Sequence, residues 1–292
     1  NKGNCFGGVL MKKTVYVVCV CVLFVLLFYE VKRNYETEND GTIIVPTGSF
    51  VSKVQKENQK TAYLTFDDGP SGNTKKIIKI LEEKGAVATF FLIGKEITGE
   101  SACKYILKFI YTTLIKKCIC LIQIISYENY LFPYGKKGNA IGVHTYCHEH
   151  NQMYASANCF YKDFRVASDC IEKIIGEKPT LHRFPWGSNN GYVKSYVDEL
   201  HNHLRKEGVR SFDWNVSGED SISPHVSQAV IFQNVKKDVT RFEKPIILLH
   251  DASAMDNTAK VLPRIIDYIK EQGYRFDTLD HREEYLFPAS WR

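Results

Sequence analysis

The feature that most constrains this chain is an alternation of short apolar runs with amphipathic helical patterns, which begins near residue 61 and continues to residue 279. Seven runs have the length and composition of buried strands: Ala62–Phe66, Val87–Ile93, Ala140–His144, Leu181–Phe184, Val209–Trp214, Pro245–His250 and Tyr274–Leu279. Helical patterns lie between most of them, at Thr74–Glu83, Phe164–Ile175, Val193–Lys206 and Ala259–Gln272. This rhythm predicts an α/β fold, a deformed TIM-like (β/α)7 barrel, with an open doubly wound sheet as the alternative.

Length and composition agree with one large folded domain. A chain of 292 residues suits a single α/β barrel, and 44% hydrophobic and 24% charged residues are ordinary for a globular protein. The net charge is +5 and the basic residues are scattered, so we expect no nucleic-acid partner. The nine cysteines include no C-x-x-C pair, which argues against a disulfide framework and against a cysteine-based zinc site.

The N-terminal region has the pattern of a targeting signal. Two lysines precede the apolar run Val15–Tyr29 and two basic residues follow it closely. Because no small-residue cleavage site follows, we expect residues 11–33 to be an uncleaved single-pass anchor in the cell membrane, with an extracellular body; a cleaved signal and a secreted protein are the alternative. Residues 1–10 are expected to lie upstream of the true start, and residues 34–60 to link the anchor to a domain at 61–285.

One segment breaks the rhythm. The connection between Ile93 and Ala140 is about twice as long as a βα unit with one helix needs. Within it, Tyr105–Ser126 is crowded with Ile, Leu, Tyr and Cys but has no clean amphipathic period. We expect an atypical insertion at about 103–130. Two interpretations stay open: an inserted helical hairpin or lid, and sequence never selected as protein, such as a translated non-coding stretch or a frame slip.

Acidic and histidine residues gather where predicted strands end. The first strand runs into L-T-F-D-D-G-P, which contains Asp67 and Asp68, and the third into H-T-Y-C-H, which contains His144 and His148. The two histidines are four residues apart and are therefore able to face one way on a helical turn. Two imidazoles and one carboxylate would make three zinc ligands and leave a fourth position open, as catalytic sites require. A cation would also offset the repulsion between the aspartates, one binding it and one staying free.

Two more strand ends carry charged residues. R-F-P-W-G offers Arg183, which could keep the free aspartate ionised, and L-L-H-D offers His250 as an acid. Each motif also has a plain structural interpretation when it is taken alone. The aspartates of D-D-G-P could form a turn or cap a helix, and a histidine after a buried strand is more often a structural hydrogen-bonding group.

Together, T-F-D-D-G-P, H-T-Y-C-H, R-F-P-W and L-L-H-D resemble, in this order, the polysaccharide deacetylases of carbohydrate esterase family four, the NodB-homology domain. The resemblance covers roughly Thr61–Leu279 outside the odd segment. It implies a deformed barrel that hydrolyses the acetamido C–N bond of N-acetylated glycans, with peptidoglycan N-acetylglucosamine or N-acetylmuramic acid as the expected substrate. It also implies one divalent metal, which we expect to be zinc, with cobalt or nickel as alternatives.

The resemblance assigns a role to each motif residue. It makes Asp67 the catalytic base, Arg183 the partner of that base, and His250 the general acid. It makes three residues metal ligands: Asp68, His144 and His148. The stretch W-N-V-S-G-E-D-S matches the fourth family motif less cleanly; Asp220 matches the aspartate that partners the acid histidine, and Asp213 is the alternative.

Three apolar side chains complete the expected site: Trp186, Trp214 and Leu248. Each would line a pocket for the acetyl methyl group or simply pack in the core. Two other functions stay open, a cyclic amide or imide hydrolase and a catalytically inactive glycan-binding wall protein. The anchor argues against the first, and the complete set of motif residues argues against the second. We expect a monomer whose partners are the glycan polymer and, through the N-terminal helix, the membrane.

Overall fold

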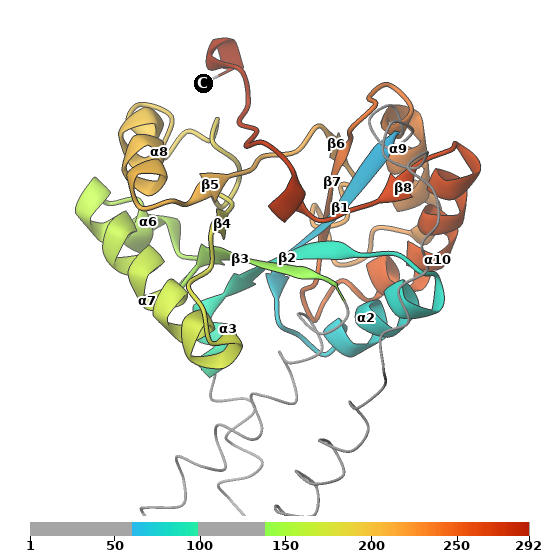
Figure 1. The fold of residues 1–292 in the computed structure, drawn as a ribbon, viewed down its shortest axis with the longest axis horizontal. Coiled ribbons are helices and arrows are strands. Elements are labelled where there is room, and N and C mark those ends of the chain that lie inside the picture. Colours follow the sequence, from blue (N-terminus) through green and yellow to red (C-terminus); the bar gives the residue numbers. More distant parts are fainter. Residues whose placement is uncertain (1–59, 99–137, 292) are drawn as a thin grey trace, which may run out of the picture. The chain divides into compact units, whose positions relative to one another are not determined.

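The fold is built on one parallel sheet, and the computed structural model describes it over residues 60–98 and 138–291 (Figure 1). The strands are β1 (Thr61–Gly69), β2 (Ala88–Ile93), β3 (Ala140–Thr145), β4 (Leu181–His182), β5 (Arg210–Ser211), β6 (Val216–Ser217), β7 (Ile246–His250) and β8 (Arg275–Phe276). They are hydrogen-bonded in the order β5-β4-β3-β2-β1-β7-β6, and β8 pairs with β1.

The strand order shows how the sheet is wound. From β1 the chain adds β2, β3, β4 and β5 in succession on one side, while β7 and then β6 lie on the other side. A doubly wound sheet reverses its winding at a switch point, whereas this is the order of a barrel opened between β5 and β6. The α/β prediction is confirmed as a half-barrel of parallel strands, consistent with a (β/α)7 barrel, and the doubly wound alternative is wrong.

The sequence pattern did not predict strand β6. The predicted run Val209–Trp214 forms only the two-residue strand β5, after which the chain turns and β6 pairs with β7. With two residues, β6 is too short to give a periodic signal. Asp220 therefore follows β6, and it lies beside the end of β7 because β6 pairs with that strand.

The helices form two groups beside the sheet. They are α2 (Thr74–Glu83), α3 (Gly94–Thr98), α6 (His150–Met153), α7 (Ala157–Ile175), α8 (Val197–Lys206), α9 (Gln228–Val239) and α10 (Asp256–Glu271), with 3-10 turns η1 (Leu279–His281) and η2 (Ala289–Trp291) near the C-terminus. Helices α2, α9 and α10 pack together, and α3, α6, α7 and α8 lie on the other side (Figure 1). The helix α7 begins earlier than predicted because the side chain of Ser156 caps it, accepting a hydrogen bond from the Cys159 amide.

The central strands are the most deeply buried. Every residue of β2 is buried, and so is all of β1 except Asp68. The rings of Phe66 and Phe90 stack across these strands with centroids 5.2 Å apart. Burying each such side chain stabilises the fold by about 1.5–3 kcal/mol. The end of β1, which carries the paired aspartates, is thus fixed by the core on both sides.

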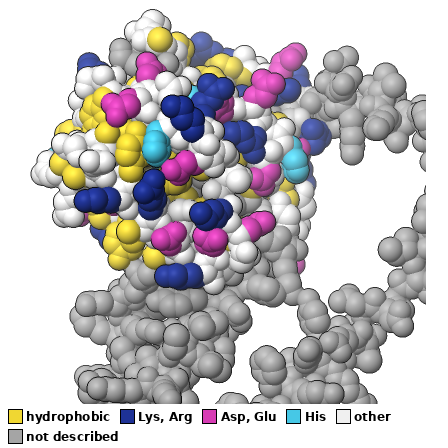
Figure 2. Space-filling view, turned by 60° about the vertical axis from the view of Figure 1, so that its left-hand side comes forward, with side chains coloured by type: hydrophobic (Ala, Val, Ile, Leu, Met, Phe, Trp, Pro, Cys, Tyr) yellow, Lys and Arg dark blue, Asp and Glu magenta, His cyan; other side chains and the backbone are white. Residues whose placement is uncertain are grey.

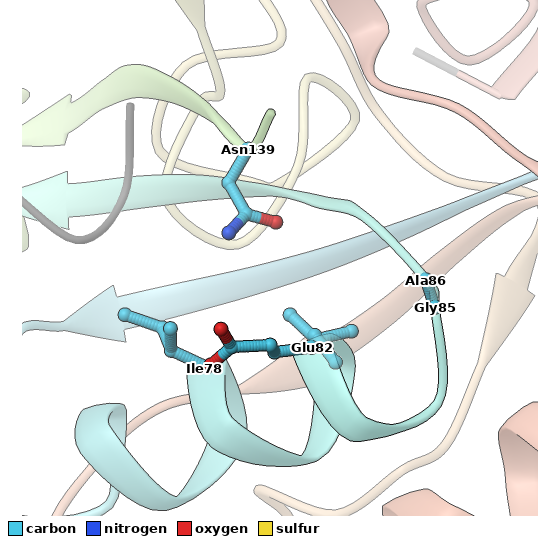
Figure 3. A pocket seen from close by; sticks show the side chains of 6 residues that line it. Ile78, Glu82, Gly85, Ala86 and Asn139 are labelled. Atoms are coloured by element: carbon cyan, nitrogen blue, oxygen red, sulfur yellow. The ribbon is translucent and has the colours of Figure 1, made fainter. Parts of the chain in front are cut away.

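A cavity of about 280 Å³ lies away from the strand ends that carry the motifs (Figure 3). Its lining is formed by Ile78, Leu81, Glu82, Gly85, Ala86 and Asn139. Gly85 and Ala86 precede β2, and Asn139 precedes β3, so the cavity is at the amino-terminal edge of the sheet. In α/β barrels this edge contributes to stability and the opposite edge carries the chemistry.

The predicted anchor at 11–33, nearly all of the 34–60 linker and the insertion at about 103–130 lie outside the described residues. Within the described ranges, none of the helices combines the length and the apolar character that crossing a bilayer requires. On the face shown in Figure 2, basic and acidic side chains are interspersed, so neither sign dominates there.

Candidate functional site

Asp67 and Asp68 both reach the same site because β1 is irregular at its end. In a regular strand, successive side chains point to opposite faces. Asp67 pairs with Phe91, but Gly69 pairs with Leu92, so Asp68 is the extra residue of a bulge, with a left-handed φ of 71°. Bulges re-aim side chains in this way and are common beside active sites.

A second bulge aims the first histidine. Val143 pairs with Leu92 and Thr145 with Ile93, which leaves His144 as the extra residue of β3. His148 follows with a left-handed φ of 55° in a segment that is neither strand nor helix. The prediction that the histidines face one way on a helical turn is therefore wrong. A bulge and a left-handed residue bring their rings together instead, with centroids 5.2 Å apart.

Asp68, His144 and His148 form a group with the geometry of metal ligands, which we name the ligand cluster. Their candidate ligand atoms all lie within 4.8 Å of one another. The Oδ1 atom of Asp68 is 3.6 Å from His144 Nε2 and 3.4 Å from His148 Nε2. This oxygen is buried and has no hydrogen-bond partner among the described residues, which is unfavourable unless a cation binds there. Two imidazoles and a carboxylate fit a divalent ion.

His144 is held in the form that binds a metal. Its Nδ1 lies 2.9 Å from the carbonyl oxygen of Arg183, so Nδ1 donates the proton and Nε2 keeps its lone pair toward the cluster. Burial, followed by the neighbouring His148, lowers the pKa of His144 to about 3. The ring is therefore neutral at physiological pH, as metal binding requires.

Asp67 lies beside the ligand cluster and is paired with Arg183. Nη1 of Arg183 donates to Oδ1 of Asp67 at 2.9 Å, while the other carboxylate oxygen lies 4.0 Å from His144 Nε2. The guanidinium is fully buried and also donates to Thr65 Oγ1 and to the carbonyl oxygen of Phe212. Burial raises the pKa of Asp67, and the charge of Arg183 opposes that rise. A buried carboxylate with a fixed orientation and a raised pKa suits a general base.

His250 lies beside Asp67 because the two residues pair in register across β1 and β7. Its Nδ1 is 2.8 Å from Oδ1 of Asp220, and its backbone amide donates to the other oxygen of that carboxylate at 2.8 Å. Burial disfavours charge on His250, but the hydrogen bond and charge of Asp220 outweigh it and raise the pKa of His250 to about 9. The imidazole is therefore protonated at neutral pH and able to donate a proton.

The alternative partner, Asp213, has a different position. It is fully buried and accepts hydrogen bonds from the amide and hydroxyl of Ser188 and from the amide of Phe287. These contacts join the loop after β4 to the C-terminal segment. The structure brings Asp220, and not Asp213, to His250.

The three expected apolar residues, Trp186, Trp214 and Leu248, differ in their exposure and in the residues that they contact. Trp186 is 42% exposed, and its ring centroid lies 4.6 Å from that of His148. Trp214 is partly buried and contacts Phe287 edge to face. Leu248 is buried two residues before His250, so its side chain leaves β7 on the same face.

No sequence pattern predicts an aromatic neighbour for Trp186, but the structure places Tyr192 beside it, and we name these two rings the aromatic rim. Tyr192 is half exposed, stacks on His150 with centroids 4.2 Å apart, and lies edge-on to Trp186. Tyr192 is in a loop, in the stretch S-N-N-G-Y, and His150 opens a four-residue helix. Neither environment has a periodic pattern that could predict this contact.

The fold and site together define a class of protein. A parallel α/β half-barrel that carries a ligand cluster, an Arg-paired carboxylate and an Asp-paired histidine at one edge has the parts of a hydrolase that activates water. The profile of the polysaccharide deacetylase family matches residues 54–204, just over half of the chain, and the chain belongs to this family.

Individual relatives agree with this membership. The chain is 28% identical over 244 residues to a peptidoglycan-N-acetylglucosamine deacetylase of Bacillus cereus, covering 82% of this chain and 76% of the relative. It is 29% identical over 207 residues to a chitooligosaccharide deacetylase of Azorhizobium caulinodans, covering 70% and 79%. The crystal structure of the polysaccharide deacetylase Bc1974 from Bacillus cereus superposes with a TM-score of 0.60 at 27% identity, covering 79% of this chain and 96% of that one.

Proposed function

We propose that this protein removes acetyl groups from N-acetylated glycans by hydrolysing the acetamido C–N bond, with N-acetylglucosamine units of peptidoglycan as its substrate. The observation that carries the proposal is the junction of the ligand cluster with two charged pairs, Asp67–Arg183 and His250–Asp220, at one edge of the sheet. Family membership and the names of the relatives support an acetylated glycan as the substrate class.

We propose that Asp68, His144 and His148 hold one divalent cation, zinc first, with cobalt or nickel able to replace it. When bound, such a cation would polarise the acetyl carbonyl and make water a stronger nucleophile near neutral pH. The unpartnered Oδ1 of Asp68 and the neutral ring of His144 support this assignment.

The two charged pairs would move the protons. Asp67, oriented by Arg183, takes the proton of the attacking water. His250 donates a proton to the departing amine, which is a poor leaving group without it, and Asp220 keeps His250 protonated for that step. Because Asp67 and His250 pair in register, the base and the acid face the same volume from neighbouring strands.

The surrounding apolar groups would hold the substrate. Leu248, Trp214 and Trp186 are proposed to contact the acetyl methyl group. The exposed face of Trp186 and the adjoining ring of Tyr192 would lie against the apolar C–H face of a sugar ring.

Acetate release tests the proposal. The purified protein, loaded with zinc or cobalt, is expected to release acetate from N-acetylglucosamine oligomers or from peptidoglycan. Peptidoglycan and chitin oligomers, compared at equal acetyl concentration, would rank the substrates. A protein that binds metal and glycan but releases no acetate would be a glycan-binding protein, and the proposal would fail.

We further propose that the protein acts outside the cell, held to the membrane by residues 11–33. The basic and apolar order of that segment and a wall polymer as substrate support this location. Protease added to intact cells is expected to digest the 61–285 domain. Complete protection in intact cells, lost on lysis, would contradict the proposal.

A further inference from the structure

The backbone between the two histidine ligands has few hydrogen-bonding options of its own. Residues 146–149 belong to no strand or helix, so their amides are not paired by a regular ladder. Buried or half-buried amides need partners, and a loop that lacks them does not hold one conformation. The left-handed φ of His148 adds to this demand, since a residue with a Cβ adopts it only when its surroundings enforce it.

One side chain from another element supplies these partners. Asp163, on α7, accepts from the hydroxyl of Thr145 at 2.5 Å and from the amide of Tyr146 at 2.6 Å with Oδ1, and from the amide of Cys147 at 3.0 Å with Oδ2. The Thr145 hydroxyl in turn accepts from the amide of His148 at 3.3 Å. A continuous chain of hydrogen bonds therefore runs from Asp163 to the second histidine ligand.

We propose that Asp163 is a positioning residue that fixes the loop of His144 and His148 in its metal-binding conformation. The inference rests on the cation site of the proposed function and adds to it a group that contacts neither substrate nor metal. Residues that orient ligands from outside the coordination shell typically change metal affinity by about 10–100-fold when altered.

The position of Asp163 on α7 suits this role. The buried residues Phe160, Phe164, Ala167 and Ile171 fix the inner face of α7 against the core. Asp163 lies three residues after Phe160 and four before Ala167, so it shares that inner face with them. A carboxylate on the packed face of a long helix is held rigidly, and it transmits that rigidity to the loop.

A carboxylate is also the group that three donors require. It offers two acceptor oxygens and no donor, whereas an amide of the same shape replaces one oxygen by NH₂. Asp163→Asn would therefore turn a donor toward the loop amides or lose one of the three contacts. The loop would sample other conformations, and His148 would spend less time in position.

Cobalt titration of the full chain tests the inference, with binding followed by visible absorption and metal-free stability followed by thermal unfolding. Asp163→Asn is expected to weaken cobalt binding by about 10–100-fold. Asp169→Asn is the matched control, because Asp169 lies on the same helix but is exposed, and it is expected to bind cobalt like the wild type. Equal affinity in wild type and Asp163→Asn, or an equal loss in the control, would overturn the inference.

Thr145 gives a second, independent test if Asp163→Asn does not fold. Thr145→Val removes the hydroxyl that links Asp163 to the His148 amide and should also weaken cobalt binding, whereas Thr145→Ser should restore it. Combining Asp163→Asn with Thr145→Val should weaken binding by less than the two separate effects combined, because both act on one network. Fully independent effects would argue against the network.

The same titrations separate a failure of this inference from a failure of the proposed cation site. If the wild type binds no cobalt, the cation site is wrong and this inference fails with it. If the wild type binds cobalt and the Asp163 and Thr145 variants bind it with the same affinity, only the positioning role fails.

Discussion

The ligand cluster and the two charged pairs adjoin each other, yet they are built in opposite ways. Asp67 and His250 lie opposite each other in register, and each has an ionic partner within the protein, Arg183 or Asp220. The ligand cluster lies on two bulges and a left-handed turn, and it leaves a buried carboxylate oxygen without a partner among the described residues. Each charged pair therefore has its counter-ion within the protein, whereas the ligand cluster would need a cation to pair its buried carboxylate oxygen.

Irregular backbone is concentrated in this cluster and its surroundings. Among the described residues, the non-glycine residues with positive φ are Asp68, His148, Trp186 and Glu219. The first three belong to the site or its rim, and the fourth directly precedes Asp220. Such conformations cost about 1–3 kcal/mol each and persist where the surrounding structure enforces them. The strained backbone at these positions therefore directs side chains toward the site, where a regular strand would not point them.

The largest expected effect comes from breaking the ligand cluster. His144→Ala removes one of the three candidate ligands, so bound metal should be lost and acetate release should fall by several orders of magnitude, because unassisted water has a pKa of about 15.7 rather than about 7. Metal analysis and acetate release measure the two effects. The control is the wild-type protein after a chelator has removed its metal, and it should lose acetate release to the same extent as His144→Ala. If His144→Ala retained both metal and activity, His144 would not be a metal ligand.

Breaking a charged pair should leave the metal in place. Asp67→Asn removes the proposed base and is expected to lower kcat by about 10²–10⁴-fold while cobalt binding persists. The charge of buried Arg183 then lacks its partner, so the variant should also be less stable by about 3–5 kcal/mol. Urea unfolding checks the stability, and acetate release is measured where the variant stays folded. Full activity would show that Asp67 is not the base.

We expect the second pair, His250–Asp220, to set the alkaline limit of acetate release. The pKa of His250 is raised to about 9 by Asp220, so His250 is charged up to that pH. In Asp220→Asn the pKa should fall to about 6.5 or below, and at pH 8 acetate release should drop roughly thirtyfold. The alkaline limb of kcat/KM should move to lower pH, measured at equal metal loading because a nearby cation also lowers this pKa. An unmoved alkaline limb would exclude His250 as the acid.

The His250–Asp220 pair should also make the stability of the fold depend on pH. Its contribution is lost as the pH rises, whereas that of a carboxylate with a lowered pKa is lost as the pH falls. Because the folded pKa of His250 exceeds its ordinary value of 6.5, the pair stabilises the folded state fully below pH 6.5. This contribution, on the order of 3 kcal/mol, is lost as pH rises through about 9. Unfolding of Asp220→Asn should lack that dependence between pH 6.5 and 9.

Sequence predicts the charged pairs and the ligand identities better than it predicts their geometry. Asp67, Arg183 and His250 lie at or directly after the carboxyl ends of strands. Because the strand ends of a parallel sheet share one edge, the sequence predicts that these residues lie close together. The bulges at Asp68 and His144 were not, because a bulge depends on the register of a neighbouring strand far away in the chain.

Asp163 shows where a signal existed and was missed. The predicted helix began at Phe164, so Asp163 fell outside it, whereas the Ser156 cap starts α7 at Ala157. With the correct start, a carboxylate on the buried face would have called for a partner. The contact between Tyr192 and Trp186 had no such signal, since loop geometry alone produces it.

The smallest expected effect tests whether the exposed aromatic rim extends the site beyond the reacting sugar. Tyr192→Ala removes the ring that stacks on His150 beside Trp186. Aromatic contacts contribute about 0.5–1.5 kcal/mol, so kcat/KM should fall about 2–10-fold on long oligomers. It should stay unchanged on the shortest one, which does not reach the rim, and Tyr192→Phe should match the wild type on both. An equal loss on every chain length would mean that Tyr192 acts by supporting Trp186 near the ligand cluster, and the rim would not be a second sugar contact.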